Sequence, residues 1–243
     1  MAFVDTLSLE MVTLLLAAVT VAYAAVMGLV EHRRRGAEGL RSSLNGTAAP
    51  LAFLGAGVFG LGLWGTVSWP LPGAYNILFS DVYVLFGLVL LSLAVSILLG
   101  ARLQYAGVFA AVAGAVTIDY GYQAYQLGLT KEPLETFLLY GAFGLSAIVA
   151  YPATLVADRM LLGRAWGAPV AAASPAAAGL FSRLGRRAAQ PVVPGADDGP
   201  ATPGVPRYAT AIVIVFALVM VGAAIAAMVF IGNTVPAHLA SPP

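Results

Sequence analysis

Four polar side chains that could bind a small solute follow one another near the end of an apolar stretch: Asp119, Tyr122, Gln123 and Gln126. Their spacing places them on one face of a helix. Counted along that helix from Leu103, Asp119 lies about 24 Å in, just beneath one surface of a hydrocarbon core roughly 30 Å thick. An ionisable residue at such a depth commonly faces a bundle interior and often has a function. The stripe therefore predicts a polar pocket that opens at that surface.

A rigid cap is expected over this pocket, formed by residues 69–81. Its two prolines fix φ angles and restrict the residues before them, and a glycine follows where a turn can use positive φ. Tyr75 and Asn76 are its candidate contacts with the polar stripe, which makes them ligand-binding candidates too. The alternative is structural, with Asp119 tying two helix ends together through Tyr75, Asn76 or a backbone N–H. The residues expected to build the cap are Trp69, Pro70, Pro72 and Gly73.

Groups suited to catalysis or metal binding are scarce in the rest of the chain. There is no cysteine, which excludes disulfides, thiolate metal sites and iron–sulfur clusters. His32 and His238 lie outside the apolar runs, which argues against a haem held by two histidines. Glu10 and Asp81 are expected at helix starts, where an acid complements the helix dipole. We therefore expect no catalytic residue, no metal and no cofactor, and the net charge of +1 gives no reason to expect nucleic acid.

The elements that must position these residues are membrane helices. The chain is 60% hydrophobic and 9% charged, whereas about a quarter of the residues of a soluble domain are charged. The apolar residues fall in runs of about 20, the length that crosses a hydrocarbon core. The predicted fold is all-α, a polytopic membrane bundle of six transmembrane helices. The six runs are approximately 9–30, 48–69, 82–99, 105–125, 136–156 and 208–231.

The distribution of positive charge predicts the orientation of this bundle. Of the 12 Lys and Arg residues, all except Lys131 fall in alternate connections between the runs. Because cytoplasmic loops carry the excess of Lys and Arg, we expect both termini and the cap to lie outside the cell. The membrane is expected to be the inner (plasma) membrane. An aromatic belt is expected at the outer boundary, made of Trp64, Trp69, Tyr75, Tyr83, Tyr120, Tyr122 and Tyr125.

Residues 158–207 have a different composition from the runs. Seven prolines among many Ala and Gly residues predict a cytoplasmic linker that is mostly disordered. The expected organisation is thus a five-helix bundle at 1–157, the linker at 158–207, and a sixth helix with a short outer tail at 208–243.

Small residues at a spacing of four predict where helices approach one another. Such stripes allow close contact between backbones in lipid, and we expect them in the bundle interior and at contacts with other subunits. They are Ala52, Ala56 and Gly60, then Ala106, Ala110 and Gly114, then Ala142, Ser146 and Ala150.

A longer pattern accompanies the cap. It consists of Trp69-Pro70-Leu71-Pro72-Gly73-Ala74-Tyr75-Asn76-Ile77, Phe79, Val84-Leu85-Phe86-Gly87, Leu127-Gly128-Leu129-Thr130, Pro133-Leu134 and Ala150-Tyr151-Pro152. In these residues the chain resembles the small prokaryotic integral membrane proteins grouped as domain of unknown function 981. The resemblance covers most of the chain and implies the membrane architecture. It brings no activity, ligand or catalytic residue.

Two classes of function follow from these observations. The first is a structural or accessory subunit of a larger membrane complex, for example a respiratory or oxidative one, with the bilayer and other membrane subunits as partners. The alternative is a small-solute transporter or channel, in which Asp119, Tyr122 and Gln123 line an outward-facing pocket. The lack of reactive side chains favours the first.

Overall fold

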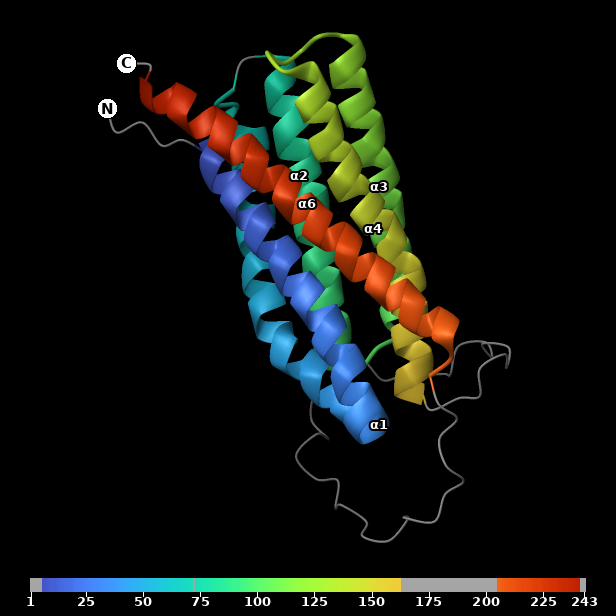
Figure 1. The fold of residues 1–243 in the computed structure, drawn as a ribbon. Coiled ribbons are helices and arrows are strands. Elements are labelled where there is room, and N and C mark those ends of the chain that lie inside the picture. Colours follow the sequence, from blue (N-terminus) through green and yellow to red (C-terminus); the bar gives the residue numbers. More distant parts are fainter. Residues whose placement is uncertain (1–5, 72, 163–204, 241–243) are drawn as a thin grey trace, which may run out of the picture.

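The computed structural model describes residues 6–71, 73–162 and 205–240, and within these ranges it is helical throughout, with short connections and no strand (Figure 1). The helices are α1 (Thr6–Ser68), α2 (Ala74–Leu99), α3 (Leu103–Gln126), α4 (Pro133–Leu162) and α6 (Arg207–Ala240). All five are long and apolar enough to cross a membrane. The prediction of an all-α protein built from such helices is therefore confirmed.

Helix α1 consists of two arms that fold back on each other (Figure 1). The first arm (residues 6–35) and the second arm (residues 37–68) meet at Gly36, whose φ of 61° and ψ of −148° lie outside the helical region. That backbone conformation is readily open only to glycine. A second glycine makes the bend tight, because a Cβ atom on Gly39 would clash with the carbonyl oxygen of Glu31.

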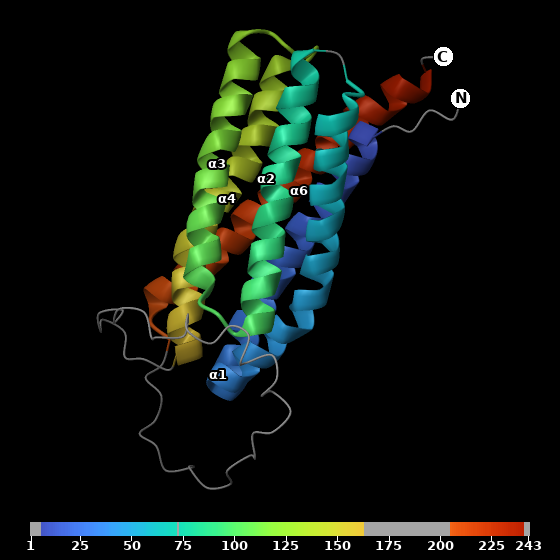
Figure 2. The ribbon, with the colours of Figure 1, turned by 180° about the vertical axis from the view of Figure 1, so that it is seen from behind.

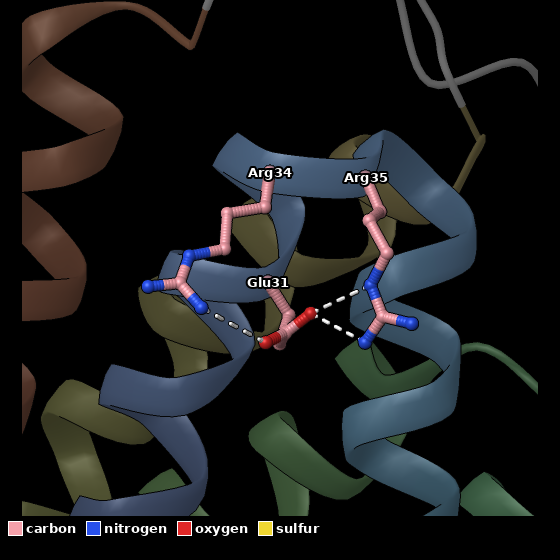
Figure 3. A network of polar contacts seen from close by, with 3 residues as sticks. All are labelled: Glu31, Arg34 and Arg35. Atoms are coloured by element: carbon pink, nitrogen blue, oxygen red, sulfur yellow. Dashed lines mark hydrogen bonds and ion pairs between the residues drawn. The ribbon is translucent and has the colours of Figure 1, made fainter.

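The bend carries a small charged network, in which Glu31 lies between Arg34 and Arg35 (Figure 3). Glu31 accepts hydrogen bonds from Arg35 Nε at 2.8 Å and from a terminal nitrogen of the same guanidinium at 2.5 Å. Arg34 approaches the other Glu31 oxygen at 4.0 Å. Both arginines are mostly exposed, and exposed pairs of this kind contribute little to stability. A hydrogen bond of 3.2 Å from Arg33 to Thr210 joins the bend to α6.

The helices pack in two pairs that α6 crosses. The most extensive contacts join α1 to α2 and α3 to α4, and α6 lies across α1 and α4. Figure 2 shows α2 and α3 side by side on the opposite face. No Cα atom of α2 comes within 8 Å of one in α4 among the described residues. Aromatic side chains bridge that distance instead, with the rings of Phe86 and Phe143 packed edge to face at 6.0 Å.

Glycines permit the close contacts within each pair. A Cβ atom at Gly62 would lie 2.6 Å from the backbone nitrogen of Val84 on α2. Gly114 of α3 and Gly144 of α4 face each other, and a Cβ atom on Gly144 would lie 2.6 Å from the Gly114 carbonyl oxygen. Glycine thus allows the helix backbones to approach closely. Such close packing stabilises helix pairs in lipid, where no hydrophobic force drives helices together.

The predicted small-residue stripes differ in outcome. The stripe on α3 is buried throughout, and that on α4 is buried at Ser146 and half-buried at its two alanines. The prediction that the stripe on the second arm of α1 faces the bundle interior is wrong, because Ala56 and Gly60 are exposed. The opposite face of that arm, with Gly55, Gly62 and Gly65, packs on α2 instead. Small residues occur on both faces of this arm, so their spacing did not identify the inner one.

Two helices begin earlier than the apolar runs predicted. Helix α2 starts at Ala74, inside the segment predicted as cap, since no proline follows and Asn76 N donates to Gly73 O at 3.2 Å. The second arm of α1 starts directly after the bend at Gly36. As a result Asp81 lies about two turns into α2, and Glu10 lies beyond the first turn of α1, so neither acid complements a helix start as predicted.

The basic residues gather at one end of the bundle. The bend of α1, the start of α3, the end of α4 and the start of α6 lie at that end, and α1 begins and α6 ends at the other (Figure 1). The described residues that bring positive charge to it are Arg33, Arg34, Arg35, Arg41, Arg102, Arg159 and Arg207.

The first residues of the predicted linker are helical. Helix α4 continues to Leu162, so residues 158–162 are helical rather than part of the linker, and α6 begins at Arg207. The remainder of the linker, 163–204, lies outside the described residues, as does the end of the predicted outer tail from residue 241.

Candidate functional site

The connection between α1 and α2 is the part of the predicted cap that is not helical. Trp69 leaves α1 with a φ of 49°, an uncommon value for a residue with a side chain, and its N–H donates to Gly65 O at 3.1 Å. Gly73 has a φ of 53° directly before α2. Trp69 and Pro70 are exposed, and Pro72 lies outside the described residues.

Asn76 holds this connection together. Its side chain is 1% exposed. The amide nitrogen donates to Gly65 O at 2.9 Å, and the amide oxygen accepts from Leu71 N at 3.4 Å. One side chain thereby ties the last turns of α1 to the chain that leads into α2. Tyr75 beside it is half-buried against the hydrophobic core.

The Asp119 stripe lies on the outside of the bundle. Asp119, Tyr122, Gln123 and Gln126 are all exposed on α3. Tyr122 packs on Phe137 of α4 with ring centroids 6.4 Å apart, and Asp119 forms no hydrogen bond or ion pair with any described residue. The stripe forms one face as predicted, but Asn76 bonds elsewhere and does not meet it. A ligand role for these residues stays a prediction.

Other residues join α2 to its neighbours at this end. Tyr120 donates to Asp81 Oδ2 at 3.4 Å, a long hydrogen bond between α3 and α2. Tyr140 of α4 donates to Leu78 O at 2.7 Å. The hydrogen bond that joins α2 to α3 here is thus between Asp81 and Tyr120, rather than between Asn76 or Tyr75 and Asp119 as expected.

A buried polar cluster that the sequence analysis missed lies between α1, α2 and α4. Glu10, Tyr83 and Tyr140 are 5%, 1% and 5% exposed. The Glu10 carboxyl interacts electrostatically with both phenol groups. Tyr83 therefore belongs to the core and not to the aromatic belt at the surface. A signal for Glu10 was present, because it shares the helix face of Leu14, Ala17 and Ala18, which are all buried.

Two atoms of this cluster have no hydrogen-bond partner among the described residues, Glu10 Oε2 and the Tyr83 hydroxyl. Thr13 and Leu14 approach the Tyr83 hydroxyl without reaching hydrogen-bond geometry. The Thr13 hydroxyl donates to Glu10 O at 2.8 Å. Buried polar groups in proteins are nearly always paired, so two unpaired ones in one cluster are unusual.

Asp158 was also missed, because the sequence analysis placed it in the linker. It is 6% exposed in the last turns of α4. Its two carboxylate oxygens accept from Leu103 N at 2.8 Å and from Gln104 N at 2.9 Å. Asp158 thus caps the first turn of α3 from another helix, where free N–H groups need partners. The role is structural.

Among the described residues two cavities of the bundle bear on the site, and neither is lined by a residue of the Asp119 stripe. The larger has a volume of about 160 Å³ and is lined almost wholly by apolar side chains of all five helices. The smaller, of about 20 Å³, is lined by Tyr83, Tyr140, Thr117 and apolar residues. Within the described part of the chain no three His, Asp or Glu residues gather as a metal site would require.

Comparison with known proteins places the chain in a family. A family model described as "Protein of unknown function (DUF981)" matches residues 1–183. No curated protein and no solved structure matches. The matched part holds the cap, the buried cluster and the four helices α1 to α4. The chain belongs to this family of unknown function.

Proposed function

We propose that this chain is a membrane subunit without catalytic machinery of its own, which attaches to other membrane subunits through one face of α1. In this proposal the chain crosses the bilayer six times, because each arm of α1 makes one crossing. Both termini lie outside, and the basic end lies in the cytoplasm.

The length of the two arms supports six crossings. Each arm has about 30 residues and is about 45 Å long, more than a hydrocarbon core of roughly 30 Å requires. The bend between them carries Arg33, Arg34 and Arg35. Basic residues next to membrane spans favour the cytoplasmic side, which supports an inside bend and outside termini.

The observation that carries the subunit proposal is the exposed face of the second arm. A Cβ atom added to Gly57 or to Gly60 would meet nothing within 4 Å, and Phe53 on the same face is 86% exposed. Ala56 and Gly60 stand four residues apart, the small-residue spacing that lets two membrane helices approach closely. A helix face that meets only lipid does not need small side chains, because large apolar ones are equally suitable there. The small side chains on this face therefore favour contact with another helix.

The alternative of a small-solute transporter with its pocket at Asp119 has less support. Asp119 is on the exposed face of α3 and lines neither cavity. We therefore do not extend the proposal to transport.

The test is to isolate the protein from its native membrane in mild detergent and to identify what co-purifies. We expect defined membrane proteins to co-purify with the parent. Gly60→Leu should release them without changing the helix content of the isolated chain. Ala115→Leu is the matched control, since Ala115 is exposed on α3, away from this face, and it should retain them. A parent that purifies alone, or a Gly60→Leu variant that keeps every partner, would overturn the proposal.

A further inference from the structure

The larger cavity lies at the axis of the bundle. Both arms of α1 and each of the other four helices contribute buried side chains to its lining, for example Ala17, Leu51, Leu90, Ala110, Ala147 and Phe216. It occurs where α2 and α4 do not approach each other, and many of the residues around it are alanine. Small side chains on helices that stay apart leave the axis unfilled. The result is a cavity of about 160 Å³ among buried side chains.

The lining of this cavity offers no partner to a polar or charged ligand. None of the described residues in it is charged, and its polar side chains are those of Thr47, Ser146 and Thr154. Each of these hydroxyls donates to a backbone oxygen of its own helix, at 2.8, 2.7 and 2.8 Å respectively. A polar ligand group would lose its hydrogen bonds to water here without replacing them. The cavity therefore disfavours polar ligands and water alike.

The volume of the cavity limits the size of an occupant. A protein cavity of about 150 Å³ with a comparable apolar lining stays dry and binds benzene or xenon. An empty cavity of this kind costs free energy in proportion to its volume, and an apolar occupant restores dispersion contacts with the lining. Small apolar molecules also transfer from water into apolar surroundings, so a bilayer around the bundle would supply them.

We propose that the larger cavity is a binding site for a small uncharged apolar molecule, of the size of benzene or toluene. Van der Waals contact with the lining holds the molecule, and no hydrogen bond is required. Phe86 and Phe143, whose rings pack edge to face at 6.0 Å, contribute aromatic surface to the lining. The site does not depend on the exposed face of α1, and Glu10 and Tyr83 do not line it.

The experiment is photolabelling of the full-length protein in lipid nanodiscs with 3-phenyl-3-(trifluoromethyl)diazirine, a substituted benzene that carries a compact photoreactive group. We expect saturable labelling at lining residues such as Leu90 and Ala110, and toluene should displace it. Labelling at exposed residues such as Val112 should rise with probe concentration without saturating, and serves as the internal reference. Phenol is similar in size to toluene but should not displace the probe at the same concentration in the bilayer, because its hydroxyl would lack a partner.

Substitutions that fill the cavity test where the probe binds. Ala110→Leu and Ala150→Leu each add bulk to the lining and should abolish saturable labelling. Ala115→Leu, at an exposed position on the same helix as Ala110, is the matched control and should leave it unchanged. Size-exclusion chromatography and helix content check that each variant is folded.

Three results would overturn the proposal. The first is labelling of the parent protein that has no saturable part at the lining residues. The second is saturable labelling that persists unchanged in both filled variants, or in the one that folds. The third is displacement of the probe by phenol as effective as that by toluene, which would contradict the apolar class of the ligand.

Discussion

Buried polar side chains in this protein fall into two kinds at the scale of single residues. Asn76 and Asp158 each bond to two backbone groups, Asn76 across a connection and Asp158 between helices. Glu10 and Tyr83 keep an unpaired atom among the described residues. Satisfied groups stabilise the fold, and an unpaired buried group costs free energy. The first kind is therefore structural.

Replacing Asn76 tests its role in the connection. Asn76→Ala leaves Gly65 O and Leu71 N without their partner, and should lower the free energy of unfolding by about 1–3 kcal/mol. Asn45→Ala, at an exposed asparagine of the same bundle, should change it little. Thermal unfolding in detergent measures both. Equal losses in the free energy of unfolding from the two substitutions would show that Asn76 does not hold the connection together.

The interhelical cap of α3 can be tested at Asp158. Asp158→Ala removes both acceptors of Leu103 N and Gln104 N, and the loss of such a cap costs about 0.5–2 kcal/mol. Asp158→Asn retains one acceptor oxygen and should cost less. Melting curves of the two variants provide the comparison. A ranking with Asn as the more damaging change would contradict a capping role.

Asp119 should contribute little to stability. Its side chain is exposed and has no bonded partner among the described residues, so Asp119→Leu and Asp119→Asn should each change the free energy of unfolding by less than about 0.5 kcal/mol. A loss of several times that size in Asp119→Leu alone would revive the structural alternative, in which this carboxylate joins helix ends.

At the scale of elements, the glycines on the two faces of the second arm of α1 lie in different packing environments. Gly62 lies against the backbone of α2, and Gly57 faces open space. Gly62 is needed for the contact between α1 and α2. Gly57 is open to contact with another protein, which is the basis of the subunit proposal.

The same substitution at both glycines tests this difference. Gly62→Ala should destabilise the bundle, because its Cβ atom would lie 2.6 Å from Val84 N, which belongs to a helix backbone that must move. Gly57→Ala should leave the isolated chain unchanged or stabilise it by up to about 1 kcal/mol, as expected from helix propensity. Thermal unfolding of the purified chain decides. Similar losses at both positions would mean that the outer face is also packed within the chain.

At the scale of the whole molecule, we expect the charged end to determine the orientation of the bundle in the membrane. The chain has no cysteine, so labelling of single-cysteine variants reports directly which side of the membrane each position faces. With the basic end in the cytoplasm, Lys131→Cys should react with an impermeant thiol reagent added outside intact cells, and Ser42→Cys should react only after the membrane is opened. Both positions are exposed. The reverse pattern would invert the orientation, and labelling of both from outside would remove one crossing by α1.

The sequence alone determined the properties that depend on local composition. Runs of apolar residues predicted helices able to cross a membrane, and alternating basic connections predicted one positive end. Prolines and a glycine predicted a cap at residues 69–81, although its part from Ala74 onward is helical. These signals are local, because each depends on the length or charge of a single segment. The four-residue stripe at Asp119 was also correct as a helix face.

Only the tertiary structure decided which faces are buried and which polar groups meet. Asp158 bonds to a backbone 55 residues away, and Glu10 interacts electrostatically with Tyr83 and Tyr140 on two other helices. In a membrane protein apolar residues surround each helix, so hydrophobic periodicity does not identify the inner face as it does in a soluble protein. The inner face is chosen by how closely backbones can approach. For that reason the sequence identified the helices but not the buried cluster between α1, α2 and α4.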